Sequence, residues 1–333
     1  MTIYKDGDAD LSALEGRQVA LMGYGNQGRA QGLNMRDSGL DVIVGNIRDE
    51  SFERAQTDGF LTMSIAEAAQ AGDVLCLFLP DEVQQAVYES EIEPHLEPGK
   101  TLNFAHGYTI RYDIIRPPAN VDVVMVAPRM IGVGVRERFV AGSGAPAFVA
   151  VEQDTTGEAW PTVLAIAKAI GATRVGALRS TFAEETELDH FAEQAVWPVI
   201  VRLLTLSYEV LVDRGYQPEA VLLELYGSGE AAQVFQEMAE VGLFKQMSFH
   251  SQTSQYGTLS RGPHVLPDAF RQTLDEALDA IQSGDFAEEW EAEQERGYPV
   301  FKRLKGKALS HPMNAIEEEL REKGVLPGNG EEE

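Results

Sequence analysis

Residues 18–28 read Gln18-Val-Ala-Leu-Met22-Gly23-Tyr24-Gly25-Asn26-Gln27-Gly28. The apolar residues 18–22 are typical of a buried parallel strand, and the segment 28–38 is compatible with a helix. Between a strand and a helix, the first glycine permits a tight turn, the second lets the backbone approach a pyrophosphate, and the third lets the helix pack closely on the strand. The stretch therefore predicts a dinucleotide site, with an ordinary glycine-rich turn as the alternative. The candidate cofactor-binding residues in it are Gly23, Tyr24, Gly25, Asn26, Gln27 and Gly28.

The first 181 residues alternate between β-type runs and helix-type segments. Helices are expected at 28–38 and 64–71, and the second opens with the capping-box spacing of Ser64 and Glu67. This alternation predicts an α/β domain with a doubly wound, mostly parallel sheet over residues 1–181. The strands are expected at 18–22, 41–45, 74–79, 101–105, 121–127 and 147–151.

Beyond residue 181 the pattern is helical. Residues 182–326 are expected to form an all-helical domain, and residues 327–333 an acidic tail. One expected helix, 220–239, has apolar residues on several of its sides and needs neighbours on all of them. We therefore expect a homodimer or a larger homo-oligomer. The other expected helices include 268–283 and 286–296.

The composition excludes several classes of protein. The chain has 333 residues, with 27 Lys and Arg against 53 Asp and Glu, which gives a net charge of −26. Proteins that coat nucleic acid or anionic membranes need clustered basic residues. We also expect no membrane span and no secretory signal, and hence a cytoplasmic protein.

The residues after the second expected strand leave the cofactor type open. Arg48 and Ser51 could hold the 2′-phosphate of NADPH, whereas Asp49 or Glu50 could bind the free 2′-hydroxyl of NADH and repel a phosphate. His106 follows the expected strand 101–105, and doubly wound sheets place their ligands at the carboxyl ends of strands. That position favours a role in the site over a role in the core.

Two pairs of carboxylates stand out in the helical half. Asp189 and Glu193 are four residues apart, so a helix places them on one face, where a Mg²⁺ ion or solvent would offset their repulsion. Glu224 and Glu230 are six apart, about 120° around a regular helix. A break or bulge at the glycines Gly227 and Gly229 could realign them.

Over residues 14–320 the chain resembles short-form (class I) ketol-acid reductoisomerases. This resemblance implies an N-terminal Rossmann domain and a helical domain that interlocks with a second subunit. The matching motifs are Gly23-Tyr-Gly-Asn-Gln-Gly28, Leu79-Pro-Asp-Glu-Val83, Phe104-Ala-His-Gly107, Met125-Val-Ala-Pro128, Thr181-Phe-Ala-Glu-Glu-Thr-Glu187 with Asp189 and Glu193, Gly215-Tyr-Gln-Pro-Glu219, Ser251-Gln-Thr-Ser-Gln-Tyr-Gly257 and Ile281-Gln-Ser-Gly-Asp-Phe-Ala-Glu-Glu-Trp290.

The resemblance also implies chemistry: two Mg²⁺ ions support an alkyl migration in a 2-aceto-2-hydroxy acid, and NADPH or NADH then reduces the product. By resemblance, Asp189 would bridge both metals and Glu193 would bind one, while Glu224 and Glu230 would reach the site of the partner subunit. The other residues with implied roles are Pro80 and Asp81 at the cofactor, Ser251 at the substrate carboxylate, and His106, Arg129 and Glu230 in catalysis.

The chain also departs from the family's pattern. Arg129 stands where a lysine is usual, and a guanidinium cannot pass on a proton as an ammonium can. The segment from Glu224 to Glu230 is two residues longer than usual, whereas Asp49, near the usual place of a phosphate-binding serine, favours NADH. Two alternatives therefore stay open. One is a divergent reductase or reductoisomerase for another 2-keto or 2-hydroxy acid, and the other is a nucleotide-binding protein without activity.

Overall fold

The computed structural model describes residues 1–327. They divide into two compact units, Met1–Asp189 and a second unit that begins at His190. The predicted domain boundary after residue 181 remains a prediction. The predicted tail lies outside the described residues from residue 328 onward.

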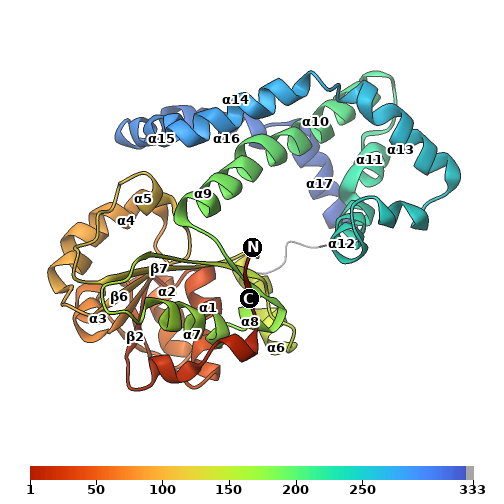
Figure 1. Ribbon diagram of the computed structural model, residues 1–333. Coiled ribbons are helices and arrows are strands. Elements are labelled where there is room, and N and C mark those ends of the chain that lie inside the picture. Colours follow the sequence, from red (N-terminus) through yellow and green to blue (C-terminus); the bar gives the residue numbers. More distant parts are fainter. Residues whose placement is uncertain (328–333) are drawn as a thin grey trace. The chain divides into compact units, whose positions relative to one another are not determined.

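The first unit is built on one nine-stranded sheet (Figure 1). The pairs β7–β8 and β1–β9 are antiparallel, and all the remaining pairs are parallel. The predicted mostly parallel sheet is therefore confirmed. In spatial order the strands are β1 (Ile3–Tyr4), β9 (Ala177–Arg179), β8 (Ala147–Gln153), β7 (Asp122–Pro128), β6 (Thr101–Phe104), β5 (Val74–Leu77), β2 (Val19–Met22), β3 (Val42–Gly45) and β4 (Leu61–Met63).

Successive residues of a strand point to opposite faces of the sheet, and both faces of this sheet are apolar. Helices therefore cover both faces. In β2, Val19 and Leu21 belong to one buried apolar cluster, and Ala20 and Met22 belong to the other. The helices of this unit are α1 (Asn26–Asp37), α2 (Glu50–Thr57), α3 (Ile65–Ala71), α4 (Asp81–Val87), α5 (Tyr108–Arg111), α6 (Gly132–Val140), α7 (Ala159–Ala169), α8 (Ala172–Val175) and all but the last two residues of α9 (Phe182–Phe191).

All six predicted strands are present, with ends that differ by one or two residues. The sequence did not indicate β1, β4 and β9, which have only two or three residues each and carry no periodic signal. The predicted capping box is confirmed: the Ser64 hydroxyl accepts the Glu67 N–H, and the Glu67 carboxylate accepts the Ser64 N–H.

The described part of the second unit is helical. The predicted helix 220–239 is wrong as one element: a π-helical turn, Leu223–Gly227, replaces its middle, and Gly229 takes a left-handed φ of 84° before a new helix begins. Gly227 and Gly229 thus mark the break that their low helix propensity allowed. The helices are α10 (Trp197–Asp213), α11 (Pro218–Leu222), α12 (Glu230–Val241), α13 (Gln252–Val265), α14 (Phe270–Ser283), α15 (Asp285–Glu295), α16 (Pro299–Leu309) and α17 (Pro312–Glu322).

The sequence predicts no membrane span, but one helix of the structure is long and apolar enough to be a candidate. Phe182–Asp213 is helical over 32 residues and, by length and composition alone, is apolar enough to cross a membrane. Pro198 and Arg202 interrupt the apolar residues of this segment, so the sequence alone did not indicate a membrane span there. Only 11% of its most apolar window is buried within one chain.

Candidate active site

The predicted cofactor residues follow adjacent parallel strands at one edge of the sheet. Gly23 follows β2, Asp49 lies four residues beyond β3, and Asp81 lies in the loop and helix start after β5. His106 follows β6, and Arg129 is the first residue after β7. Because these five strands are parallel neighbours, their carboxyl ends meet at one edge, which is where doubly wound sheets bind ligands.

The dinucleotide turn has the geometry that its glycines predict. Gly23 has a left-handed φ of 99°, and a Cβ on Gly28 would lie 2.4 Å from the Gly23 carbonyl oxygen. A Cβ on Gly25 would meet nothing within 4 Å, so the turn is open on that side. Helix α1 begins at Asn26 and has no side-chain cap, which leaves its first N–H groups able to bind phosphate.

Two side chains of this turn are bound within the protein. The buried Tyr24 donates a hydrogen bond of 2.9 Å to Asp58, which also accepts one of 2.8 Å from Nε of Arg29. Gln27 donates through Nε2 to the Met130 carbonyl at 2.9 Å. These two side chains therefore fix the shape of the turn and join it to the loop after β7.

The loop after β3 surrounds a cavity of about 440 Å³ lined by Asn46, Arg48 and Phe52, among others. Arg48 lies over the Phe52 ring at 5.6 Å. Asp49 is the N-cap of α2, and its Oδ1 accepts the Phe52 N–H at 3.0 Å and Nδ2 of Asn46 at 2.8 Å. Ser51 lies in the first turn of α2. The structure thus fixes an acid four residues beyond β3, and dinucleotide-binding domains of this type use an acid after the second strand to bind ribose.

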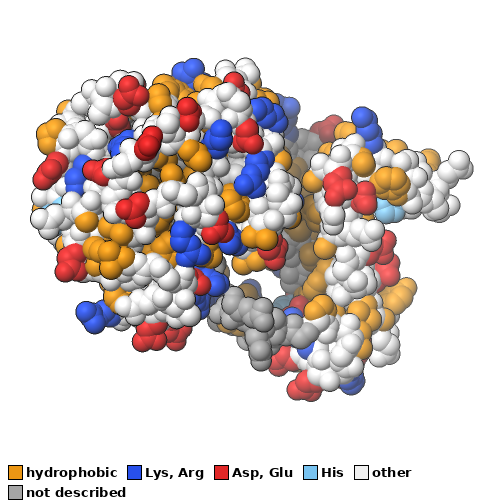
Figure 2. All heavy atoms as spheres, turned by 90° about the horizontal axis from the view of Figure 1, so that it is seen from below, with side chains coloured by type: hydrophobic (Ala, Val, Ile, Leu, Met, Phe, Trp, Pro, Cys, Tyr) orange, Lys and Arg blue, Asp and Glu red, His pale blue; other side chains and the backbone are white. Residues whose placement is uncertain are grey.

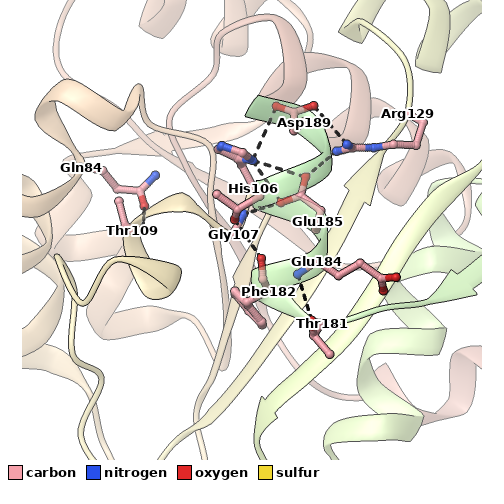
Figure 3. Close-up of polar contacts among 11 residues, drawn as sticks. Gln84, His106, Gly107, Thr109, Arg129, Thr181, Phe182, Glu184, Glu185 and Asp189 are labelled. Atoms are coloured by element: carbon pink, nitrogen blue, oxygen red, sulfur yellow. Dashed lines mark hydrogen bonds and ion pairs between the residues drawn. The ribbon is translucent and has the colours of Figure 1, made fainter. Parts of the chain in front are cut away.

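His106, Glu185, Arg129 and Asp189 form one charged cluster (Figure 3). The Glu185 side chain has no exposed area, and its Oε2 lies 3.1 Å from Nδ1 of His106. The same oxygen accepts the Gly107 N–H at 2.8 Å. Glycine is required at position 107, because a Cβ there would lie 2.6 Å from the Phe182 carbonyl oxygen of α9.

Arg129 contacts two carboxylates with two separate nitrogen atoms. Its Nη2 donates to Oε1 of Glu185 at 2.6 Å, and its Nη1 donates to Oδ1 of Asp189 at 3.1 Å. The other oxygen of Asp189 faces Nδ1 of His106 at 3.9 Å, which is beyond hydrogen-bond distance. Asp189 is thus tied to the cluster through one of its two oxygens.

The cluster shifts the pKa values of its members. Burial by itself lowers the pKa of His106, but the hydrogen bond and charge of Glu185, with the charges of Asp81 and Asp189, raise it to about 9. Burial raises the pKa of Asp81, which the charge of His106 partly offsets. His106 is therefore held in its protonated form at neutral pH.

A second polar link holds the loops after β5 and β6 together. Thr109 donates to Oε1 of Gln84 at 2.7 Å, and Nε2 of Gln84 donates to the Leu79 carbonyl at 3.1 Å. Pro80 is the exposed N-cap of α4, and Asp81 is the first residue of that helix. These contacts position the loop that carries Pro80 and Asp81.

The other predicted metal ligands lie in the second unit. Glu193 lies in a π-helical turn, Ala192–Val196, and Glu224 lies in the π-helical turn Leu223–Gly227. Glu230 is the first residue of α12, and all three side chains are exposed in the single chain. Within residues 1–327, no group of three or more Asp, Glu, His or Cys side chains is arranged to hold a metal. The predicted metal centre therefore remains a prediction.

Ser251 has a structural task in the single chain. It is the N-cap of α13, and its hydroxyl oxygen accepts the Ser254 N–H at 3.2 Å. A hydroxyl that accepts in this way keeps its own proton for donation. The predicted contact with the substrate carboxylate is thus compatible with the cap and stays a prediction.

Glu185 is a residue of this cluster that was not predicted from the sequence. The signal was present, because Glu185, Asp189 and Glu193 follow one another at intervals of four. Glu184 is a neighbouring acid of the same type, but it is exposed and accepts a hydrogen bond from Ser180. Only the packing of α9 against the loop after β6 distinguishes these two glutamates.

Comparisons with known proteins agree with this geometry. The family model for the acetohydroxy acid isomeroreductase NADPH-binding domain matches residues 13–176, and that for the ketol-acid reductoisomerase C-terminal domain matches residues 182–324. The NADP(+) ketol-acid reductoisomerase of Pyrobaculum calidifontis is 45% identical over 321 residues, which are 96% of this chain and 97% of that protein. The corresponding protein of Kineococcus radiotolerans is 44% identical over 96% of this chain and 93% of its own length.

A solved structure is also similar. An NADH-preferring ketol-acid reductoisomerase from an uncultured archaeon superposes with a TM-score of 0.93 at 38% identity, covering 97% of this chain and 99% of the other. The similarity thus extends over both units in sequence and in fold. This chain belongs to the ketol-acid reductoisomerase family.

Proposed function

We propose that this protein converts 2-acetolactate and similar 2-aceto-2-hydroxy acids to 2,3-dihydroxy acids in branched-chain amino-acid biosynthesis. The observation that carries the proposal is the cluster of His106, Arg129, Glu185 and Asp189 at the sheet edge that also holds the dinucleotide turn. A nicotinamide nucleotide bound at that turn supplies the hydride of the reduction. His106, protonated through Glu185, is the group that gives a proton to an oxygen of the substrate.

The alkyl migration requires Mg²⁺, which when bound polarises the carbonyl group and stabilises negative charge on oxygen. Asp189 fits such an ion, because carboxylate oxygens are ligands that Mg²⁺ prefers and its Oδ2 lies outside the hydrogen-bonded contacts of the cluster. We assign Asp189 and Glu193 of one subunit, with Glu224 and Glu230 of the second subunit, to two ions. Ser251 donates to the substrate carboxylate.

The decisive test is the oxidation of NADH or NADPH with 2-acetolactate, followed at 340 nm. We expect turnover that requires Mg²⁺ and that falls at least about 100-fold in Asp189→Asn, which removes a proposed metal ligand. Glu184→Gln, an exposed neighbour on the same helix, is the matched control and should keep its activity. Absence of turnover with both nucleotides, with Mg²⁺ and at low or high salt, would overturn the proposal.

We further propose that NADH is the preferred nucleotide. Asp49 is fixed at the end of β3 by two hydrogen bonds, and a carboxylate there accepts a ribose hydroxyl but repels a 2′-phosphate. The residues that would instead favour NADPH are Arg48, which lies over the Phe52 ring, and Ser51 in the first turn of α2. The similar structure from an uncultured archaeon is also that of an NADH-preferring protein.

Arg129 favours a second candidate function, the reduction of a different 2-keto acid. A guanidinium cannot take part in proton transfer as a lysine ammonium does. If that transfer is essential for the migration, the protein should reduce 3-hydroxypyruvate-type keto acids and fail with 2-acetolactate. Isomerisation of 2-acetolactate at an equal or higher rate would exclude this candidate.

The protein is proposed to act as a dimer or larger homo-oligomer in the cytoplasm. Hydrophobic side chains reach the surface of the helical unit in several places (Figure 2), and Val201, Phe249 and Tyr256 are each more than 60% exposed in the single chain. Exposed apolar area of this kind marks a surface for association. A second copy of the chain would cover it and would bring Glu224 and Glu230 to the neighbouring site.

A further inference from the structure

Arg129 is fixed in place from four directions. Its backbone N–H donates to the Pro146 carbonyl at 2.8 Å, and its guanidinium lies over the Phe148 ring at 5.1 Å from the centroid. Its two terminal nitrogens bind Glu185 and Asp189. Its Nε is buried and has no hydrogen-bond partner among the residues that the structure describes.

These contacts leave the guanidinium little freedom to move away from Asp189. A rotation that released Asp189 would also break the contact with the fully buried Glu185, whose charge would then lose a partner. The planar group also stacks on Phe148 and stays protonated. A lysine at this position would behave differently, because its small ammonium on a flexible stem can leave one carboxylate and keep the other.

The contact with Arg129 limits how many oxygens of Asp189 can bind metal ions. A carboxylate that bridges two metal ions uses both of its oxygens, but Oδ1 of Asp189 already accepts a hydrogen bond from Nη1 of Arg129 at 3.1 Å. Oδ2 lies 3.9 Å from Nδ1 of His106, beyond hydrogen-bond distance, and is therefore the oxygen that can bind an ion without giving up a hydrogen bond to Arg129.

We propose that Arg129 is a positioning residue that keeps Oδ1 of Asp189 occupied, so that this carboxylate binds one divalent cation through Oδ2 and the second ion binds weakly. The family resemblance implies instead that Asp189 bridges both ions. The inference rests on the proposed metal-dependent function and deepens it. It predicts that the metal stoichiometry of this protein depends on the identity of residue 129.

Titration of the assembled, metal-free enzyme with Mn²⁺, with free Mn²⁺ measured by electron paramagnetic resonance, tests this without any turnover. We expect one tighter and one weaker class of site, and in Arg129→Lys the weaker class should tighten about tenfold. Lysine keeps the positive charge, so this variant separates geometry from charge. Arg129→Gln, which loses both the hydrogen bond and the charge, is the second variant and should tighten the weaker class at least as much.

Arg111→Gln is the matched control. Arg111 binds Glu187 at 2.9 Å, and Glu187 lies on α9, the helix that also carries Asp189. Like the substitution of Arg129, Arg111→Gln therefore removes an arginine that pairs with a carboxylate of α9. We expect it to change the Mn²⁺ affinities by less than about threefold. Circular dichroism of each variant verifies that the fold is retained.

The outcomes separate this inference from the proposed function. If Mn²⁺ binding is abolished by Asp189→Asn but is the same in the parent protein and in Arg129→Lys, the role of Arg129 is wrong and the metal site stands. Two equally tight sites in the parent protein would also overturn the role of Arg129. If no variant binds Mn²⁺, or if Asp189→Asn has no effect, the metal assignment of the proposed function fails as well.

Discussion

Glu185 shows how one buried side chain sets the charge of another. Its carboxylate has no exposed area, and burial alone raises its pKa. Hydrogen bonds from His106 and Gly107, with the charges of His106 and Arg129, more than offset this effect and lower the pKa below its ordinary value. In return it raises the pKa of His106 to about 9. We expect Glu185→Gln to lower the pKa of His106, because burial then favours the neutral ring. NMR titration of the imidazole protons measures this, with Glu184→Gln as the control.

The same two shifts give the pH dependence of stability. The contribution of Glu185 is present above its unfolded pKa of 4.5 and is lost as pH falls through its lower folded value. That of His106 is fully present below 6.5 and is lost as pH rises through about 9. Glu185→Gln should therefore cost about 3 kcal/mol in the free energy of unfolding near pH 6 and less above pH 9. Urea unfolding at both pH values tests this, and an equal cost at both would contradict it.

Asp49 has two tasks that a substitution can separate. It caps α2 and presents a charge at the end of β3. In Asp49→Ser the hydroxyl can still cap the helix, so stability should hold within about 1 kcal/mol. We expect the affinity for NADPH to rise about tenfold as the repulsion of the 2′-phosphate disappears. Fluorescence titration with each nucleotide measures this. Glu50→Gln is the control, and an unchanged NADPH affinity would show that Asp49 does not select the cofactor.

At the scale of elements, the strand, turn and helix of residues 19–37 offer a matched pair of glycines. A Cβ on Gly25 would meet nothing within 4 Å, and its φ of −78° suits any residue. A Cβ on Gly28 would lie 2.4 Å from the Gly23 carbonyl oxygen. Gly25→Ala should therefore leave the melting temperature unchanged and weaken nucleotide binding at least about tenfold, because the methyl group enters the space of the pyrophosphate.

Gly28→Ala should reduce both properties, with a loss of stability of about 2 kcal/mol or more. Thermal unfolding and isothermal titration calorimetry with NADH distinguish the two variants. The assignment of the turn would be wrong if Gly25→Ala bound NADH as tightly as the parent protein does.

Strands and helices with a regular pattern of apolar residues could be predicted from the sequence. Features that depend on tertiary packing could not. Buried parallel strands appear as apolar runs, so the strand ends that carry Gly23, His106 and Arg129 could be located from the sequence. The π-helical turn that contains Glu193 could not, because it has no periodic signature. Near Glu224 the glycines Gly227 and Gly229 indicated a break or bulge, but not its π-helical form. The burial of Glu185 depends on the approach of α9 to Gly107, a contact between residues 78 apart.

At the scale of the whole molecule, the two units differ in how they bury apolar side chains. The first unit contains two large buried clusters, one on each face of its sheet. The main buried cluster wholly within the described part of the second unit contains only Leu222, Leu320 and Leu326. Helix α10 exposes 63% of Val201 and 51% of Leu203. A helical unit with so little core of its own needs further contacts to be stable.

We therefore expect Val201→Asp to dissociate the oligomer, because a carboxylate in an apolar interface loses its hydration without a partner. Val140→Asp is the matched control: Val140 on α6 of the first unit is 68% exposed, so the same change there adds a charge without touching α10. Light scattering coupled to size-exclusion chromatography measures the mass of both variants. Val201→Asp should also lose activity, since Glu224 and Glu230 would no longer reach a neighbouring site. A parent protein that is monomeric, with a folded helical unit and full activity, would contradict the shared site, because each chain would then have to supply all of its own metal ligands.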